Sequence, residues 1–324
     1  MRAPCGVPIV LALALTAVLA GCSAGGPQSE RTGSTVDTDD FAIAQDFPDP
    51  DVLATGDGYY AYATNGAGVN VQMAQSSDLE TWEVLAGDAL PVLPDWASPG
   101  KTWAPDVSEL APGEFVMYFT AASKSPALQC IGVATSTSAG GPFVPADSAP
   151  IVCPDGEGGA IDPATFVDDD GRRYLLWKND GNCCGLDTWL QIAELSPDGT
   201  ALVGETTKLL MQDQSWEGNL IEAPTLVRRD GVYVLLYSAN DYGSDAYAIG
   251  YATASGPRGP FVKADGPLLT TAISDGRYLG PGGQDVVVGP DGADRLVFHS
   301  WDSLFIERGV NVLPLRWQNG QPEI

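Results

Sequence analysis

Residues 161–177 read IDPATFVDDDGRRYLLW, and four other stretches of the chain repeat this plan of strand, tight turn and aromatic-rich strand. The five units open at positions 49, 104, 162, 222 and 283, which are separated by 55, 58, 60 and 61 residues. Their openings are Asp49-Pro50-Asp51-Val52, Ala104-Pro105-Asp106-Val107, Asp162-Pro163-Ala164-Thr165, Glu222-Ala223-Pro224-Thr225 and Gly283-Gln284-Asp285-Val286. A repeat of this length decides the architecture before any single motif is considered.

The units contain signals for short strands separated by tight turns. Tight turns between the first and second strands are predicted at Asp57-Gly58, Asp170-Gly171, Asp230-Gly231 and Asp291-Gly292. Second strands are expected at 59–63, 115–119, 174–177, 233–237 and 296–301. Third strands are predicted at 69–74, 131–135 and 249–253, and fourth strands at 82–85, 142–144 and 260–262.

This pattern predicts an all-β fold, a five-bladed β-propeller with four antiparallel strands per blade. A β-sandwich is the alternative, but a sandwich does not require matching aromatic strands at one period. Beyond the N-terminal segment, no stretch has sustained helical periodicity.

The N-terminus is expected to direct export. Residues 7–20 form an apolar run that is too short for a permanent membrane span, which indicates a signal peptide over residues 1–21. Leu19-Ala20-Gly21-Cys22 resembles the site at which bacterial lipoproteins are cleaved and lipidated, so Cys22 is the predicted lipid attachment residue. An ordinary signal peptide is the alternative.

The segment that follows is expected to tether a folded domain to that lipid. Residues 22–40 are rich in Gly, Ser, Thr and Asp, which predicts a flexible linker, and residues 41–324 remain for the propeller. The protein is therefore expected at the outer face of the bacterial cell membrane, held by its lipid, or secreted.

The sequence has a formal net charge of −26 at pH 7, from 42 acidic and 16 basic residues. Such a surface repels nucleic acid and anionic membranes, so neither is expected as a partner except for the membrane contact made by the N-terminal lipid. Solubility outside the cell also favours an acidic surface. We expect a monomer.

Four cysteines lie within the predicted propeller, and an even number in an exported chain favours disulfides. Cys130 with Cys153 is the favoured bridge, and Cys183 with Cys184 would form a vicinal one. Zinc binding is the competing interpretation, but the chain has no Cys-x-x-Cys pair and a single histidine, His299.

Two sets of acids recur at the starts of the first strands. The set that begins the units is Asp49, Asp162 and Glu222. The set two residues further along, on the same face of each strand, is Asp51, Asp106 and Asp285. An Asp before Pro can simply begin a strand or turn. Because first strands lie nearest a propeller axis, however, these like charges are expected to converge in a partly buried funnel, which is costly and indicates chemistry.

Carboxylates held together have pKa values that are pushed apart, so one can stay protonated near neutral pH while another is ionised. Acid-catalysed cleavage of an acetal uses such a pair, since an acid protonates the glycosidic oxygen while a base activates water on the opposite face of the sugar. A Ser-His-acid triad is disfavoured because His299 would be its only histidine, and no glycine-rich phosphate loop opens a helix. The residues therefore favour a glycosidase.

Four motifs, in order and with blade spacing, resemble those of glycoside hydrolase family 43. They are Phe47-Pro48-Asp49-Pro50-Asp51-Val52, Trp103-Ala104-Pro105-Asp106-Val107, Ile161-Asp162-Pro163-Ala164-Thr165-Phe166 and Ile221-Glu222-Ala223-Pro224-Thr225-Leu226. Phe298-His299-Ser300-Trp301 resembles the fifth-blade histidine motif of that family. The resemblance extends from about residue 46 to the end. It implies inverting hydrolysis of arabinose- and xylose-containing plant polysaccharides and oligosaccharides, with no cofactor required for the chemistry.

The resemblance also implies three catalytic roles. Asp49 would be the general base that deprotonates water, and Glu222 the general acid that protonates the leaving oxygen. Asp162 would raise the pKa of Glu222 and hold it in place. In such relatives a histidine like His299 lies near a central ion, often calcium, so a structural Ca²⁺ near the axis is expected. A buried core position is the alternative for His299.

Substrate contacts are expected from aromatic rings, which stack on sugar faces, and from polar groups in the funnel. Trp103 is the first candidate, with Trp301 and Trp177 behind it, and blade packing is the alternative for each. Arg277 lies in the loop between the fourth and fifth blades, where it would bind sugar hydroxyls or remain solvated. Asp51, Asp106 and Gln284 complete the predicted substrate-binding residues.

Gln284 marks a departure from the family pattern. Several arabinofuranose-active relatives have a histidine after Gly-Pro-Gly, whereas this chain reads Gly280-Pro281-Gly282-Gly283-Gln284. The sugar is therefore left open, as is exo or endo cutting. A galactan- or fructan-directed propeller glycosidase and a non-catalytic carbohydrate-binding lipoprotein are the alternatives.

Overall fold

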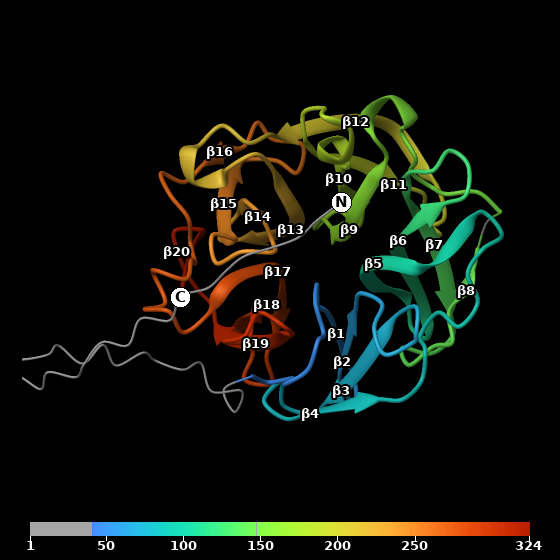
Figure 1. The fold of residues 1–324 in the computed structure, drawn as a ribbon, viewed down its shortest axis with the longest axis horizontal. Helices are drawn as coiled ribbons and strands as arrows, with labels where there is room; N and C mark the ends of the chain where they lie inside the picture. The colour runs from blue at the N-terminus through green and yellow to red at the C-terminus, as the bar shows by residue number, and fades with distance from the viewer. Residues whose placement is uncertain (1–40, 147) are drawn as a thin grey trace, which may run out of the picture. The chain divides into compact units, whose positions relative to one another are not determined.

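The computed structural model describes residues 41–146 and 148–324, which form a five-bladed β-propeller (Figure 1). The predicted signal peptide, the tether and Cys22 lie outside the described residues. The all-β prediction is confirmed, since the helical segments within the described part are three short 3-10 turns: η2 (Asp155–Glu157), η3 (Gly181–Cys184) and η4 (Ser215–Glu217). No helix in this part is long and apolar enough to cross a membrane.

Each blade is an antiparallel sheet whose first strand lies innermost (Figure 1). The first blade has β1 (Asp51–Thr55), β2 (Gly58–Ala63), β3 (Gln72–Ser76) and β4 (Trp82–Leu85). The second has β5 (Ala97–Ala111), β6 (Glu114–Ser123), β7 (Gln129–Ser136) and β8 (Val144–Pro145). The third has β9 (Ala160–Val167), β10 (Arg173–Asn179), β11 (Leu190–Leu195) and β12 (Leu202–Leu210). The fourth has β13 (Ile221–Arg229), β14 (Val232–Ala239), β15 (Ala248–Ala254) and β16 (Val262–Lys263).

The fifth blade is completed by the start of the domain. Its sheet contains β17 (Leu279–Val288), β18 (Asp294–Trp301) and β19 (Arg308–Pro314), and a hairpin of β20 (Arg316–Gln318) and β21 (Gln321–Glu323) follows. Ile43 forms an antiparallel bridge with Val310 of β19, and the Val310 amide donates to the Ile43 carbonyl at 3.1 Å. The N-terminal segment therefore closes the ring at the outer edge of this blade.

The second strand of each blade is buried because neighbouring blades cover both of its faces. In β6, Val116 and Tyr118 pack against the third blade, while Met117 and Phe119 pack against the first. The described residues contain five apolar clusters of this kind, one at each junction between adjacent blades. Successive side chains of a strand point to opposite faces, and here each face packs against a neighbouring blade. Both sets of side chains are therefore apolar, so these strands are continuously apolar rather than alternating.

Most strands extend the predicted ones by a few residues. The third strand of the first blade is shorter, because Val69 donates its amide to the Gly66 carbonyl at 2.9 Å in a turn and the strand begins at Gln72. In the second blade the fourth strand begins at Val144, and the preceding Phe143 is buried in the core instead.

Candidate active site

The inner end of each blade contains one residue in the left-handed backbone region. Such φ values are uncommon outside glycine and persist where the surrounding structure holds them, often at functional sites. These five kink residues are Asp49 (φ 55°), Ala104 (41°), Asp162 (55°), Ala223 (49°) and Gly283 (57°). The same backbone kink therefore recurs at one position of every blade.

Glu222 was predicted to occupy the same position of the repeat as Asp49 and Asp162, and this prediction is wrong. Glu222 lies one residue before the kink residue of its blade. In the fourth blade the kink residue is Ala223, and the proline that follows it is Pro224. The same order of kink residue and proline is present in the first three blades, so the sequence contained the signal for this shift. The structural repeat starts at 49, 104, 162, 223 and 283.

The amide of each kink residue is held by a side chain. In four blades the acceptor belongs to a residue in the last four positions of the preceding blade's second strand or just after that strand. These pairs are Asp49 with His299 Nδ1 (3.0 Å), Ala104 with Thr64 Oγ1 (2.9 Å), Asp162 with Thr120 Oγ1 (3.1 Å) and Gly283 with Ser238 Oγ (2.9 Å). Because the acceptors come from neighbouring blades, the blades jointly fix the backbone that presents Asp49 and Asp162.

Lys178 occupies the fifth of these acceptor positions but has no acceptor atom. The Ala223 amide donates instead to Asp162 Oδ2 at 3.0 Å. The Lys178 side chain is fully buried, and its ammonium donates to Glu222 Oε2 at 3.3 Å and to Asn182 Oδ1 at 2.7 Å. This one exception to the pattern therefore places a cation against Glu222.

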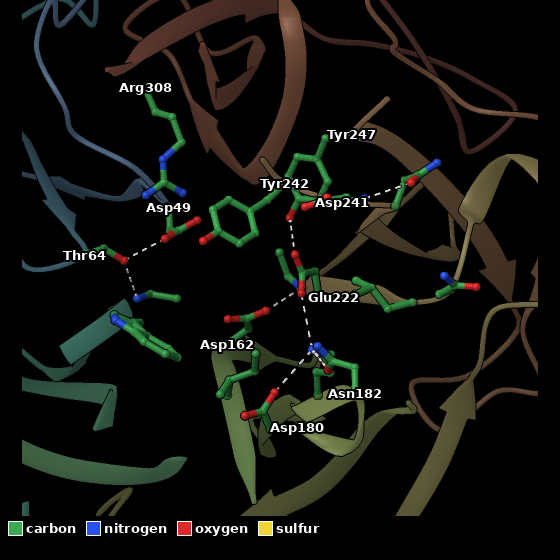
Figure 2. A pocket seen from close by; sticks show the side chains of 18 residues that line it. Asp49, Thr64, Asp162, Asp180, Asn182, Glu222, Asp241, Tyr242, Tyr247 and Arg308 are labelled. Atoms are coloured by element: carbon green, nitrogen blue, oxygen red, sulfur yellow. Dashed lines mark hydrogen bonds and ion pairs between the residues drawn. The ribbon is translucent and has the colours of Figure 1, made fainter. Parts of the chain in front are cut away.

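The three predicted catalytic carboxylates lie together in one pocket (Figure 2). Asp49 Oδ2 accepts a 2.6 Å hydrogen bond from the hydroxyl of Thr64. Glu222 Oε1 accepts a 2.8 Å hydrogen bond from the hydroxyl of Tyr247 (Figure 2), while Oε2 accepts from Lys178. Each carboxylate is thus oriented by at least one donor.

Asp162 and Glu222 interact strongly. Burial and then the charge of Glu222 raise the pKa of Asp162 from 3.8 to about 8, although Lys178 opposes the rise. Asp162 therefore binds its proton more tightly than an ordinary aspartate and stays protonated at neutral pH, next to Glu222. A protonated carboxyl group beside a second, oriented carboxyl group can serve general acid and base chemistry.

The pocket has a volume of about 590 Å³, within the range of small-molecule sites. Trp103 lines it, as predicted for an aromatic sugar contact, and Tyr242 supplies a second ring. Arg308 is the guanidinium that reaches the pocket. Arg277 is not among the lining residues and lies 5.4 Å from the ring of Tyr278.

Lys178, Tyr247 and Arg308 line the pocket but were not predicted from the sequence. A lysine within the apolar strand at 174–178 was a detectable signal, because a buried charge needs a partner. Nothing local distinguished Arg308 from Arg277, since its position in the pocket depends on how the fifth blade packs.

Asp51, Asp106 and Gln284 line a narrow axial channel rather than the pocket. Each of these residues makes hydrogen bonds within the scaffold. Asp51 Oδ2 accepts from the Val107 amide (2.9 Å), Asp106 Oδ2 from the Thr165 amide (2.8 Å) and Asp285 Oδ2 from the Val52 amide (2.9 Å). Gln284 donates to the Ala223 carbonyl at 2.6 Å and accepts from Ser238 at 2.8 Å. The geometry therefore gives these residues a role in joining first strands of adjacent blades, and it places them outside the pocket that contains Glu222.

The contacts of His299 do not suit a direct ligand of the calcium ion that is expected near it. Burial lowers the pKa of His299 to about 3, so the ring is neutral. Its Nδ1 accepts the Asp49 amide, so the proton of the neutral ring is on Nε2 and neither nitrogen has a free lone pair for a metal. Nε2 has no hydrogen-bond partner among the described residues and is suited to donate to a water molecule.

Two disulfides are present, Cys130–Cys153 and the vicinal Cys183–Cys184. The first joins β7 to the segment before η2, within the wall between the second and third blades. The second lies in η3, directly after Asn182, the residue that accepts from Lys178. The vicinal bridge therefore belongs to the turn that packs beside the candidate active site.

Comparison with known proteins agrees with this geometry. The sequence profile of glycosyl hydrolases family 43 matches residues 42–322. A β-D-galactofuranosidase from Aspergillus niger is 26% identical, covering 78% of this chain and 73% of the relative. The extracellular endo-α-(1→5)-L-arabinanase 1 of Bacillus subtilis is 27% identical, covering 85% of this chain and 86% of the relative. The crystal structure of a thermostable family-43 glycoside hydrolase is similar with a TM-score of 0.76 at 29% identity, covering 86% of this chain and 92% of that one.

Proposed function

Because the chain belongs to glycosyl hydrolases family 43 and is a glycosidase, we propose that it hydrolyses arabinose- or xylose-containing plant polysaccharides and oligosaccharides with inversion of configuration. The observation that carries this proposal is the pocket in which Asp49, Asp162 and Glu222 converge, where the charge of Glu222 helps to raise the pKa of Asp162. The arabinanase similarity supports the substrate class.

In the proposed reaction Asp49 is the general base. The Thr64 hydroxyl donates to its Oδ2, which stabilises a carboxylate and orients it, and Oδ1 remains to accept a proton from the attacking water. His299 holds the backbone of Asp49 through its amide. An inverting site needs this water on the face of the sugar opposite the acid.

Glu222 is the proposed general acid, and Asp162 is its partner. In the proposed step the protonated carboxyl group of Glu222 donates its proton to the leaving glycosidic oxygen, and Lys178 and Tyr247 then stabilise the carboxylate that remains. The carboxyls themselves supply acid and base, so the proposed chemistry requires no cofactor.

The test is hydrolysis by Glu222→Gln and Asp49→Asn variants of linear arabinan, xylan, galactofuranosides and aryl glycosides. Both variants should lose about 10²–10⁴-fold on polysaccharide. Glu222→Gln should keep most activity on a dinitrophenyl glycoside, whose leaving group needs no proton, whereas Asp49→Asn should not. Asp241→Asn, at the rim of the same pocket, is the matched control.

Two results would overturn the proposal. The first is unchanged polysaccharide hydrolysis in both variants. The second is a first-formed product of retained anomeric configuration by NMR, which would indicate a nucleophilic carboxylate instead of an activated water.

We further propose export and lipid anchoring through Cys22. The B. subtilis relative is named as extracellular, which supports export, and the sequence before residue 23 supports the lipid. Radiolabelled palmitate should enter the protein made in bacteria and be lost in Cys22→Ala. Labelling that persists in this variant contradicts the anchor.

A further inference from the structure

Tyr242, Trp301 and Phe305 form a group of aromatic side chains, here called the rim platform, at the mouth of the pocket. The rings of Trp301 and Phe305 stack with centroids 5.8 Å apart. The guanidinium of Arg308 lies 5.3 Å from the Tyr242 ring and 5.4 Å from the Trp301 ring. Tyr242 and Arg308 also line the pocket, so the rim platform is continuous with it.

The rim platform is fixed before any ligand binds. Trp301 Nε1 donates to the Tyr242 carbonyl at 2.7 Å, which ties the loop after β14 to the end of β18. Asp302 closes the loop between β18 and β19, since its amide donates to the Glu307 carbonyl at 2.9 Å and its Oδ1 accepts from the Ile306 amide at 2.7 Å. Rings held in this way lose little conformational freedom when they bind a ligand.

The loop presents apolar groups to solvent at a conformational cost. Phe305 has a φ of 54°, an outlying value for a bulky residue, and its side chain stays 41% exposed rather than turning into the core. Leu304 and Ile306 beside it are 72% and 66% exposed. Backbone strain that places an apolar patch beside a pocket is typical of a ligand contact.

The chemistry of the rim platform suits a sugar ring. Aromatic faces pack against the C–H groups of a sugar, and the Arg308 guanidinium can donate to its hydroxyls. Arg308 Nε lies 3.9 Å from Asp46 Oδ1, and the residue lines the pocket beside the rings. We propose that the rim platform is a subsite that binds a further sugar unit of the substrate chain, outside the pocket where the bond is cut. This inference rests on the proposed function.

The experiment compares Phe305→Gly with the wild-type protein on arabino- and xylo-oligosaccharides of two to six units and on an aryl glycoside. Glycine adopts positive φ without steric penalty, so this variant removes the ring without adding strain. Phe305→Tyr keeps the ring. Val262→Ala, on the outermost strand of the fourth blade, is the control for loss of an exposed apolar group.

We expect kcat/KM of the wild-type protein to rise about tenfold at the chain length that reaches the rim platform, the effect of about 1.4 kcal/mol from one stacked ring. Phe305→Gly should abolish that rise through KM and leave the aryl glycoside within twofold. Phe305→Tyr and Val262→Ala should retain it. Binding of the same oligosaccharides to Glu222→Gln, measured by calorimetry, should weaken about tenfold when Phe305→Gly is added.

Three outcomes overturn the inference. One is an unchanged length dependence in Phe305→Gly, and another is an equal loss on aryl glycoside and long chains. The third is a change in oligomeric state of Phe305→Gly with length dependence intact, which would make the patch a protein contact. Hydrolysis of no glycoside by the wild-type protein would instead refute the proposed function, and the calorimetric result would then decide the subsite by itself.

Discussion

The substitution Asp106→Asn should stabilise the protein at neutral and alkaline pH, because Asp106 is an acid that the fold keeps buried near the propeller axis. Its Oδ2 accepts from the Thr165 amide, but its Oδ1 has no hydrogen-bond partner among the described residues. Burial, and to a smaller extent the nearby Asp285, raises the pKa of Asp106 from 3.8 to about 7. Asparagine can keep the acceptor for Thr165 and never carries a charge.

The sign and size of the effect follow from proton linkage. The folded state binds the Asp106 proton more tightly than the unfolded state, so this residue lowers stability progressively as pH rises from about 4 to about 7. One pKa unit corresponds to about 1.4 kcal/mol, which sets a ceiling of about 4 kcal/mol above pH 7. Because Asp106 shares its environment with other axial acids, we expect a gain of about 2–4 kcal/mol at pH 8 and almost none near pH 4.

Urea unfolding followed by tryptophan fluorescence at several pH values between 4 and 8 measures this difference. Asp57→Asn, in an exposed turn, is the control and should show no trend. An Asp106→Asn protein that is no more stable than the wild type at pH 8 would refute the reasoning. So would a difference that is constant across the pH range, because a constant difference cannot arise from titration.

The other predictions concern the pocket and ring closure. In the pH profile of kcat/KM, the loss of activity at alkaline pH should have its midpoint near 8, the pKa of Asp162. Lys178→Met should move this midpoint to higher pH, because the ammonium of Lys178 lowers the pKa of Asp162, and an unchanged midpoint contradicts the prediction. In a nitrogen-15 NMR titration His299 should stay neutral down to about pH 4 with its proton on Nε2, and a midpoint near 6.5 is the contrary result. Ile43→Ala should lower the free energy of unfolding in urea by about 2–4 kcal/mol, because Ile43 is buried where the ring closes, and exposed Ile273→Ala should not; equal effects would refute this.

The kink residues show how a repetitive fold supports a site that is not repetitive. All five blades use the same backbone conformation, and four of the five hold it with a histidine, threonine or serine from the preceding blade. Lys178 departs from this rule and approaches Glu222, and Asp162 takes over the missing acceptor. One substitution in the repeat thus creates both the cation beside the acid and the hydrogen bond that holds Asp162.

The sequence by itself determined the architecture of this protein. The spacing of the units and the Asp-Gly turns are local properties, and continuously apolar second strands have no stable position except between two blades. The carboxylates Asp49, Asp162 and Glu222 could be chosen from the same repeats. The sequence also indicates that Glu222 lies one residue before the kink, because Pro224 follows Ala223 as a proline follows Asp49, Ala104 and Asp162. Aligning the units by their acids instead places Glu222 at the kink position.

Only the tertiary structure decided what surrounds those carboxylates. Lys178 meets Glu222 across 44 residues of sequence, and His299 meets Asp49 across 250. No local period encodes such contacts, because they depend on which side chains of separate blades reach the same point near the axis. For that reason Arg308 rather than Arg277 lines the pocket, and Asp106 joins the first strands of two blades.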